Sequence, residues 1–183
     1  MLLEALRDAV ALVLLGICFY TDAVQQRIYN VVTLPAIALG LLLNLALAGV
    51  TGAKMSGLGA AVGFGALFLL FMLGAMGGGD VKLMAAVGAI KSYPFVVSSL
   101  VYSFLVGGFI GIAVLIWKQK FWRTMHGLLR WCLGKVLPFP SKPLDPKKME
   151  RVPFGIAIVL GTIWAEVMRL LGTPDIIQQW RGL

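Results

Sequence analysis

The chain has 183 residues, of which 60% are hydrophobic and only 13% charged, and its formal net charge is +8. A soluble domain usually has about a quarter charged residues, so this composition excludes an ordinary water-soluble protein. The positive charge would suit a nucleic-acid binder, but most basic residues lie in one loop between apolar segments, which is typical of membrane proteins. We therefore expect an all-α polytopic membrane protein with no nucleic-acid partner.

Six apolar runs follow one another along the chain, most of them near the ~20 residues that a helix needs to cross a bilayer. They lie at roughly 3–21, 31–50, 57–76, 81–93, 94–117 and 152–172. The run at 81–93 is short, so it either completes its crossing with the preceding glycines or lies buried among the other helices. Asn44 requires neighbouring helices to satisfy its amide. We expect one membrane-embedded domain over 1–183, with the first run retained rather than cleaved as a signal peptide.

The distribution of lysine and arginine orients these predicted helices. The loop at 118–151 has nine basic residues, which places it on the cytoplasmic side. Counting crossings back from this loop puts 22–30 and 77–80 on the cytoplasmic side and 51–56 outside. On this map 11 of the 16 basic residues are cytoplasmic. The outer face keeps Arg7, Lys54, Lys91, Arg169 and Arg181.

The first part of the basic loop, 118–135, has its own pattern. Its apolar residues recur at helical spacing, at Phe121, Met125, Leu128 and Cys132, with basic residues elsewhere around the turn. This pattern predicts an amphipathic helix in the membrane interface, with its cations on anionic lipid headgroups. The alternative is a solvated loop that only satisfies the charge rule.

Two carboxylates that are remote in sequence reach the same membrane face on this map. Asp22 lies at the end of the first run and Asp80 at the start of the fourth. If they approach within hydrogen-bond reach they share one proton, as an aspartic protease requires. The helix dipole favours the ionised form of Asp80 at a helix N-terminus and disfavours that of Asp22 at a helix C-terminus. We therefore expect Asp22 to hold the shared proton more often.

A purely structural interpretation of the same residues stays open. Asp80 would then be a helix cap, and Asp22 an ordinary charge beside the membrane. Glycines at small-residue spacing would serve only close helix packing, at Gly59/Gly63, Gly74/Gly78 and Gly107/Gly111. The two cysteines, Cys18 and Cys132, predict neither a disulfide nor a zinc site, and we expect no metal or cofactor.

Three motifs occur in order along the chain, and together they resemble those of type IV prepilin peptidases. The run Gly77-Gly78-Gly79-Asp80-Val81-Lys82 resembles the GxGD signature of that family. The stretch from Asp22 to Asn30 resembles its first aspartate motif, an aspartate followed by basic residues and Ile-Pro-Asn. Val152-Pro153-Phe154-Gly155 resembles the Pro-Phe-Gly element that opens its last helix.

The resemblance implies a membrane aspartyl endopeptidase in the bacterial inner membrane. Such an enzyme cuts the basic leader from prepilins or pseudopilins after a glycine at the cytoplasmic boundary. Asp22 and Asp80 would be the catalytic pair, Gly77 and Gly79 would let substrate backbone approach, and Lys82 would tune the pair or orient substrate. The remaining matched motif positions, with a substrate or structural role, are Arg27, Asn30, Pro153, Phe154 and Gly155.

The chain departs from the family pattern in several places. Tyr29 stands where proline is common, Gln25 and Gln26 replace basic residues, and Ile156 stands where a second proline often follows Pro-Phe-Gly. We expect these departures to affect local backbone geometry rather than chemistry. The chain has no CxxC pair and no room for the cytoplasmic domain of the larger bifunctional members. It resembles the short peptidase-only form of tight-adherence (Flp-type) pili, and we do not expect methyltransferase activity.

Other functions remain as alternatives. A presenilin-like protease would cleave within a transmembrane helix, but six segments are too few for it. A small proton-coupled transporter or channel could use Asp22 and Asp80 as relay groups, and would have charged residues spread through the bilayer depth. A non-enzymatic pilus assembly factor would not need either carboxylate for leader removal. The sequence indicates neither the oligomeric state nor which prepilins are cut.

Reversing the charge of the basic residues in 118–135 should weaken membrane association more than leader recognition, because prepilin leaders are themselves basic. Membrane association is measured by carbonate extraction and by vesicle flotation with and without anionic lipid. Tighter leader binding with intact membrane association would contradict this interpretation.

Overall fold

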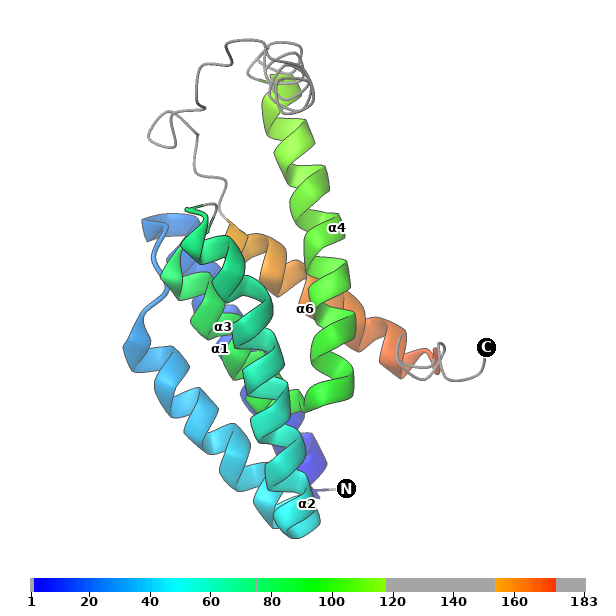
Figure 1. Cartoon of the computed structure of the whole chain (residues 1–183). Coiled ribbons are helices and arrows are strands. Elements are labelled where there is room, and N and C mark those ends of the chain that lie inside the picture. The colour runs from blue at the N-terminus through cyan, green and yellow to red at the C-terminus, as the bar shows by residue number, and fades with distance from the viewer. Residues whose placement is uncertain (1, 75, 118–153, 174–183) are drawn as a thin grey trace, which may run out of the picture. The chain divides into compact units, whose positions relative to one another are not determined.

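The computed structural model describes residues 2–74, 76–117 and 154–173. Across these ranges the chain is all-helical, as predicted, and contains no strand. The helices are α1 (Leu2–Gln25), α2 (Asn30–Met72), α3 (Gly78–Lys91), α4 (Tyr93–Trp117) and α6 (Phe154–Leu170) (Figure 1). The predicted interfacial helix at 118–135 lies outside the described residues.

The chain divides into two compact units. The first joins Met1–Gly107 with Pro153–Leu183, and the second is Gly108–Val152. The features described below all belong to the first unit.

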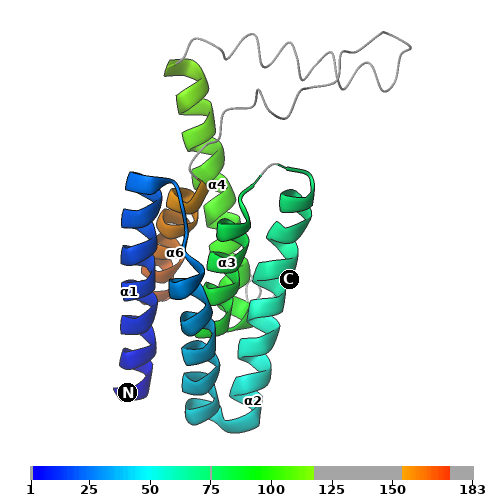
Figure 2. The same cartoon turned by 90° about the vertical axis from the view of Figure 1, so that its left-hand side faces the viewer.

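Helix α2 consists of two arms that run back along each other. The helical dihedral angles are interrupted at Ala48 and Gly49, and Gly49 has a φ of 59°, a conformation that glycine adopts without steric cost. Figure 2 shows the two arms of α2 side by side after this reversal. The predicted outer loop at 51–56 is therefore wrong, because those residues are helical and the chain reverses before them.

Each of the six predicted apolar segments corresponds to a helix or to one arm of α2. Two of the described helices, α2 and α4, are long and apolar enough to cross a membrane. Much of their apolar surface is exposed, which suits a lipid environment rather than water. Six membrane crossings remain a prediction.

Helix α3 is the central helix of this unit and contacts α1, α2 and α6. Its 14 residues span only about 21 Å at 1.5 Å per residue, and nearly all of them from Asp80 to Lys91 are buried. The short predicted segment is thus enclosed by its neighbours. Figure 2 shows α3 inside the bundle, with the arms of α2 along one side.

Glycines bring the backbones of α2 and α3 into direct contact. A Cβ atom added to Gly59 would lie 2.3 Å from the carbonyl oxygen of Gly88, and one added to Gly63 would lie 2.6 Å from that of Met84. The prediction that Gly59 and Gly63 serve close packing is therefore confirmed. The predicted packing role of Gly74, paired with Gly78, is wrong. Gly74 lies after the end of α2, where it has a φ of 73° and open space around it.

Side chains of α2 satisfy the carbonyl groups at the end of α3. The amide Nδ2 of Asn44 donates to the carbonyl oxygens of Ala89 and Ile90 at 3.0 and 2.9 Å. The hydroxyl of Ser56 donates to the same Ala89 oxygen at 2.6 Å. The neighbouring helix thus satisfies Asn44, as expected from sequence, and Asn44 in turn pairs the last carbonyls of α3, which have no partner within their own helix.

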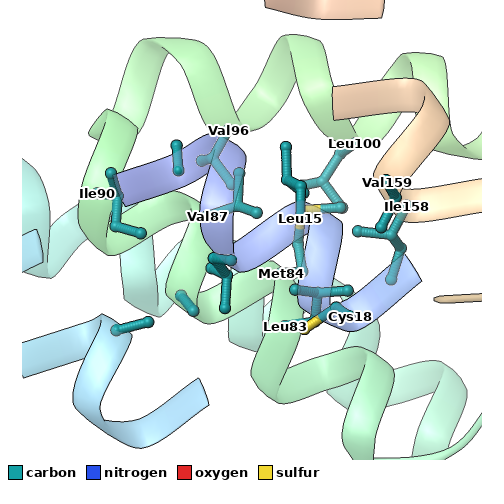
Figure 3. Packing of buried hydrophobic residues seen from close by; sticks show 14 of the residues in the cluster. Leu15, Cys18, Leu83, Met84, Val87, Ile90, Val96, Leu100, Ile158 and Val159 are labelled. Carbon is teal, nitrogen blue, oxygen red and sulfur yellow. The ribbon is translucent and has the colours of Figure 1, made fainter. Parts of the chain in front are cut away.

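Apolar side chains from four helices meet around α3. Figure 3 shows them pointing into a common interior between α1, α3, α4 and α6. The labelled residues are Leu15, Cys18, Leu83, Met84, Val87, Ile90, Val96, Leu100, Ile158 and Val159. This interior fixes how the three helices that carry the candidate site face one another.

A network of charged side chains joins α1, α3 and α6 at one end of this interior. Lys91, only 7% exposed, donates from Nζ to Asp8 at 2.7 Å and to Glu166 at 2.8 Å. Arg169 also binds both carboxylates, and Arg7 lies 3.7 Å from Asp8. This network therefore contains three of the five basic residues that the sequence places on the outer face, namely Arg7, Lys91 and Arg169.

Replacing Lys91 with methionine should destabilise the protein strongly. The change keeps most of the side-chain volume but removes the buried cation between Asp8 and Glu166 and leaves them with Arg169, and losing hydrogen bonds to charged groups in this way costs about 1.5–3 kcal/mol. Thermal unfolding in detergent measures the effect. Lys54→Met, at an exposed lysine of α2, is the matched control. Equal melting of the two variants would show that the network does not stabilise the fold.

Candidate active site

Asp22 and Asp80 occupy the helix ends that face each other across the α1–α3 contact. Asp22 lies in the last turn of α1 and is 5% exposed, whereas Asp80 lies in the first turn of α3 and is 9% exposed. Both lie just beyond the predicted apolar spans at 3–21 and 81–93. Burial of two carboxylates from helices that are remote in sequence requires specific partners for each.

The backbone of the glycine run binds Asp80. Its Oδ2 accepts the N–H of Gly77 at 3.2 Å, and its own N–H donates to the carbonyl oxygen of Gly77 at 3.2 Å. Burial raises the pKa of Asp80 to about 6; the Gly77 N–H opposes this rise, and the negative charge of Asp22 adds to it. The predicted position of Asp80 at a helix N-terminus is correct, but burial raises its pKa more than the helix dipole lowers it.

The first turn of α6 binds Asp22. Its Oδ2 accepts the backbone N–H of Ile156 at 2.9 Å. Burial raises the pKa of Asp22, and this N–H opposes the rise. The partial positive charge at the N-terminus of α6 thus offsets the partial negative charge at the C-terminus of α1, which disfavours an ionised Asp22. The expectation that Asp22 holds the shared proton more often rested on the dipole of α1 alone and did not include a second helix that begins at Asp22.

Gly155 makes this approach possible. A Cβ atom at this position would lie 2.5 Å from Oδ2 of Asp22 and 2.7 Å from its Cγ, well inside contact distance. The glycine of the Pro-Phe-Gly element therefore has a steric reason to be glycine. Pro153 itself lies outside the described residues.

Phe154 anchors the same end of α6 against α4. Its ring lies 5.9 Å from that of Phe104, centroid to centroid, and a Cβ atom on Gly107 would lie 2.6 Å from it. The predicted packing role of Gly107 is confirmed to this extent, since its missing side chain makes room for the ring. Phe154 and Gly155 together hold the first turn of α6 over Asp22.

Ile28 is a site residue that sequence reasoning did not single out. It lies in the connection between α1 and α2 and packs against two of the motif glycines. A Cβ atom on Gly79 would lie 2.9 Å from Cβ of Ile28, and one on Gly155 would lie 3.0 Å from its Cδ1. The only signal was its place inside the first aspartate motif. Ile28 thus joins the three motifs into one cluster.

Two further motif residues, Lys82 and Asn30, pair with each other, whereas Arg27 does not join this pair. Lys82 donates from Nζ to Oδ1 of Asn30 at 2.9 Å, which ties the start of α3 to the start of α2. Arg27 is exposed. Tyr29, at the position where the family has proline, donates from its hydroxyl to Gln25. Among the described residues, no group of three or more His, Cys, Asp or Glu side chains is placed to hold a metal ion.

The model of the type IV leader peptidase family matches residues 9–112, which include both aspartates. The chain belongs to the type IV leader peptidase family. No curated protein and no solved structure matches it. Family membership makes the chain a peptidase with prepilin-type substrates, and together with the apolar helices it makes the protein a membrane protein. The match ends before α6, so the contribution of α6 to this leader peptidase rests on the contacts described above.

Replacing Asp22 with asparagine should lower the pKa of Asp80 from its value of about 6, because a nearby negative charge is removed. Infrared titration of the carboxyl band of the purified leader peptidase measures this midpoint. Glu4→Gln, at the other end of α1, is the matched control and should leave it in place.

The same group makes stability depend on pH. The folded pKa of Asp80 lies above its unfolded value of about 4, so its contribution to stability is complete below that pH and is lost as the pH rises through 6.

An unchanged Asp80 midpoint in Asp22→Asn would show that the two carboxylates do not interact.

Proposed function

We propose that this leader peptidase is an aspartyl endopeptidase that removes the basic leader of prepilins or pseudopilins after a glycine at the cytoplasmic membrane face. The observation that carries the proposal is the pair of buried carboxylates, Asp22 and Asp80. Their helices bring them close enough that the charge of one raises the pKa of the other. Sharing one proton between two such groups is the property on which aspartic proteases depend.

The hydrogen bonds of the pair leave it suited to the reaction. Each carboxylate accepts a backbone N–H through Oδ2, from Ile156 for Asp22 and from Gly77 for Asp80. Within the described part of the chain no such bond is made to either Oδ1 atom. In the proposed reaction one oxygen of each acid positions the group, and the other interacts with water or with the scissile carbonyl.

The roles follow from the surroundings of the two acids. Asp22, supported as an anion by the first turn of α6, takes a proton from water as the water oxygen attacks the peptide carbonyl carbon. Asp80 donates its proton to the carbonyl oxygen, giving a neutral tetrahedral diol. Asp22 then passes its proton to the leaving nitrogen while Asp80 takes one back from the diol, the C–N bond breaks, and the pair again holds one proton.

The location of the site supports cleavage at the cytoplasmic boundary. The carboxylates lie at one end of α1 and α3, and the Asp8–Lys91–Glu166 network lies at the other end. Along α1, the 14 residues from Asp8 to Asp22 span about 21 Å. The positive loop at 118–151 orients the carboxylate end inward. We place the protein in the bacterial inner membrane with six spans, and its partners are prepilin-type substrates and, at 118–135, anionic lipid.

The interior does not favour the transporter alternative. Between its carboxylate end and its charged network, the contact among α1, α3 and α6 is formed mainly by apolar side chains such as Leu15, Met84 and Ile158 (Figure 3), and the buried hydroxyl groups of Ser99 and Thr162 bind each other there. A proton relay between the two ends requires polar groups or water at this depth.

Asp22→Asn and Asp80→Asn, tested separately, should each reduce leader removal from a co-expressed prepilin by a factor of about 10²–10⁴, the usual contribution of a general acid or base. Leader removal is read from the mobility and N-terminal sequence of the pilin. Glu4→Gln is the matched control, and membrane levels of all variants are compared by immunoblot. Full cleavage by either neutral variant would exclude the catalytic pair.

A further inference from the structure

The first turn of α6 supplies Asp22 with a partner that the family pattern does not predict. The backbone N–H of Ile156 lies 2.9 Å from Oδ2 of Asp22, within normal hydrogen-bond distance. The N–H groups of a first helical turn have no partner within their own helix and point at whatever lies before it. Here a buried carboxylate lies there.

We propose that the backbone N–H of Ile156 holds Asp22 as the ionised member of the pair, which makes Ile156 a positioning residue for the proposed hydrolysis. This inference rests on the proposed function of Asp22 and Asp80. It assigns to α6 the task of deciding which acid takes the proton from water and which donates to the substrate.

The identity of residue 156 decides whether this hydrogen bond exists. Proline, which often follows Pro-Phe-Gly in the family, has no N–H to donate. Isoleucine at the same position provides one. The departure at Ile156 was expected to affect only local backbone geometry, but its N–H reaches a carboxylate of the candidate active site. This chain thus has a donor to Asp22 that a member with proline at this position lacks.

The remaining groups around Asp22 leave this donor a clear role. From α3 the group that faces Asp22 is Asp80, whose negative form disfavours a second charge. On α1 the thiol of Cys18 lies one turn earlier and is buried. Lys82 is bound to Asn30, and in the described part of α6 the first titratable group is Glu166, about 15 Å along the helix from Ile156. The N–H of Ile156 is therefore the stabilising partner that Asp22 has in the described structure.

Two neighbours keep α6 in place for this contact. Gly155 has no Cβ atom to meet Asp22, and the ring of Phe154 occupies the space above Gly107. Both features are set by side-chain size alone. Because these contacts are made by residues other than Ile156, we expect them to remain when the N–H of Ile156 is removed.

Ile156→Pro removes the donor while keeping a residue type that the family uses here. Proline is tolerated in a first helical turn, and Gly155 before it has no Cβ to meet the proline ring. We expect the pKa of Asp22 to rise by about one unit, because a hydrogen bond to its charged form is lost. Infrared titration of the Asp22 carboxyl, separated from Asp80 by the Asp80→Asn background, measures the shift directly. Ile156→Val keeps the N–H and is the matched control.

Activity gives a second measurement on the full chain. The acid limb of the pH profile for prepilin cleavage should move up by about one unit in Ile156→Pro, with kcat reduced below that limb and KM nearly unchanged. Gly155→Ala, which pushes α6 away from Asp22, should shift the limb in the same direction. Gly16→Ala, in open space on α1, should not.

The outcomes separate this inference from the proposed function. An Asp22 titration in Ile156→Pro that matches Ile156→Val would overturn the role of Ile156, whatever the activity of the variant. If Asp22→Asn and Asp80→Asn are inactive at the same time, the proposed function stands without it. If those neutral variants cleave fully, the proposed function itself fails.

Discussion

The buried ammonium group of Lys91 is the interaction on which the arrangement of the site depends. It binds Asp8 of α1 and Glu166 of α6 from the end of α3, so one cation joins three helices. Moving any of these helices by one turn would leave a buried charge without its partner, which costs several kcal/mol. Because helices are nearly rigid over 10 to 14 residues, a register fixed here is carried to the opposite end. There the same three helices present Asp22, Asp80 and the first turn of α6.

Helix α3 can be short because its neighbours satisfy both of its ends. At its C-terminus, Asn44 and Ser56 of α2 bind the last carbonyl groups. At its N-terminus, Asp80 and Gly77 bind each other. In a membrane an unsatisfied backbone group costs several kcal/mol, so a helix shorter than the hydrocarbon layer must be enclosed in this way. The glycines of α2 permit that enclosure, and it places Asp80 inside protein rather than in lipid.

Much of this arrangement could be predicted from the sequence, because long apolar runs predict helices and the positive loop indicates a common face for Asp22 and Asp80. The reversal of α2 was misplaced because Thr51, Lys54 and Ser56 look like loop residues. In the structure Ser56 faces inward and binds a carbonyl of α3, and the bend falls at Gly49, where φ is positive. Single polar residues in an apolar run do not reveal whether their partner is water or a neighbouring backbone.

The candidate site could be located from sequence but its electrostatics could not. Each aspartate could be assigned a helix end, and the dipole argument then made Asp22 the better proton carrier. The dipoles of α1 and α3 alone give this order, without any contribution from α6. The N–H of Ile156 belongs to α6, 134 residues away in sequence, and contact between them depends on the docking of Phe154 and Gly155.

A third helix, α6, therefore changes the balance between the two carboxylates of the pair. Both accept a backbone N–H at a helix N-terminus, so the dipole no longer separates them in the direction that the sequence implied. What remains is burial and mutual repulsion, and these raise the pKa of Asp80 to about 6. In the proposed hydrolysis a carboxyl with a raised pKa serves as the acid, and Asp22 serves as the base. The first turn of α6 thus removes the preference for a protonated Asp22 that the dipole of α1 alone would give.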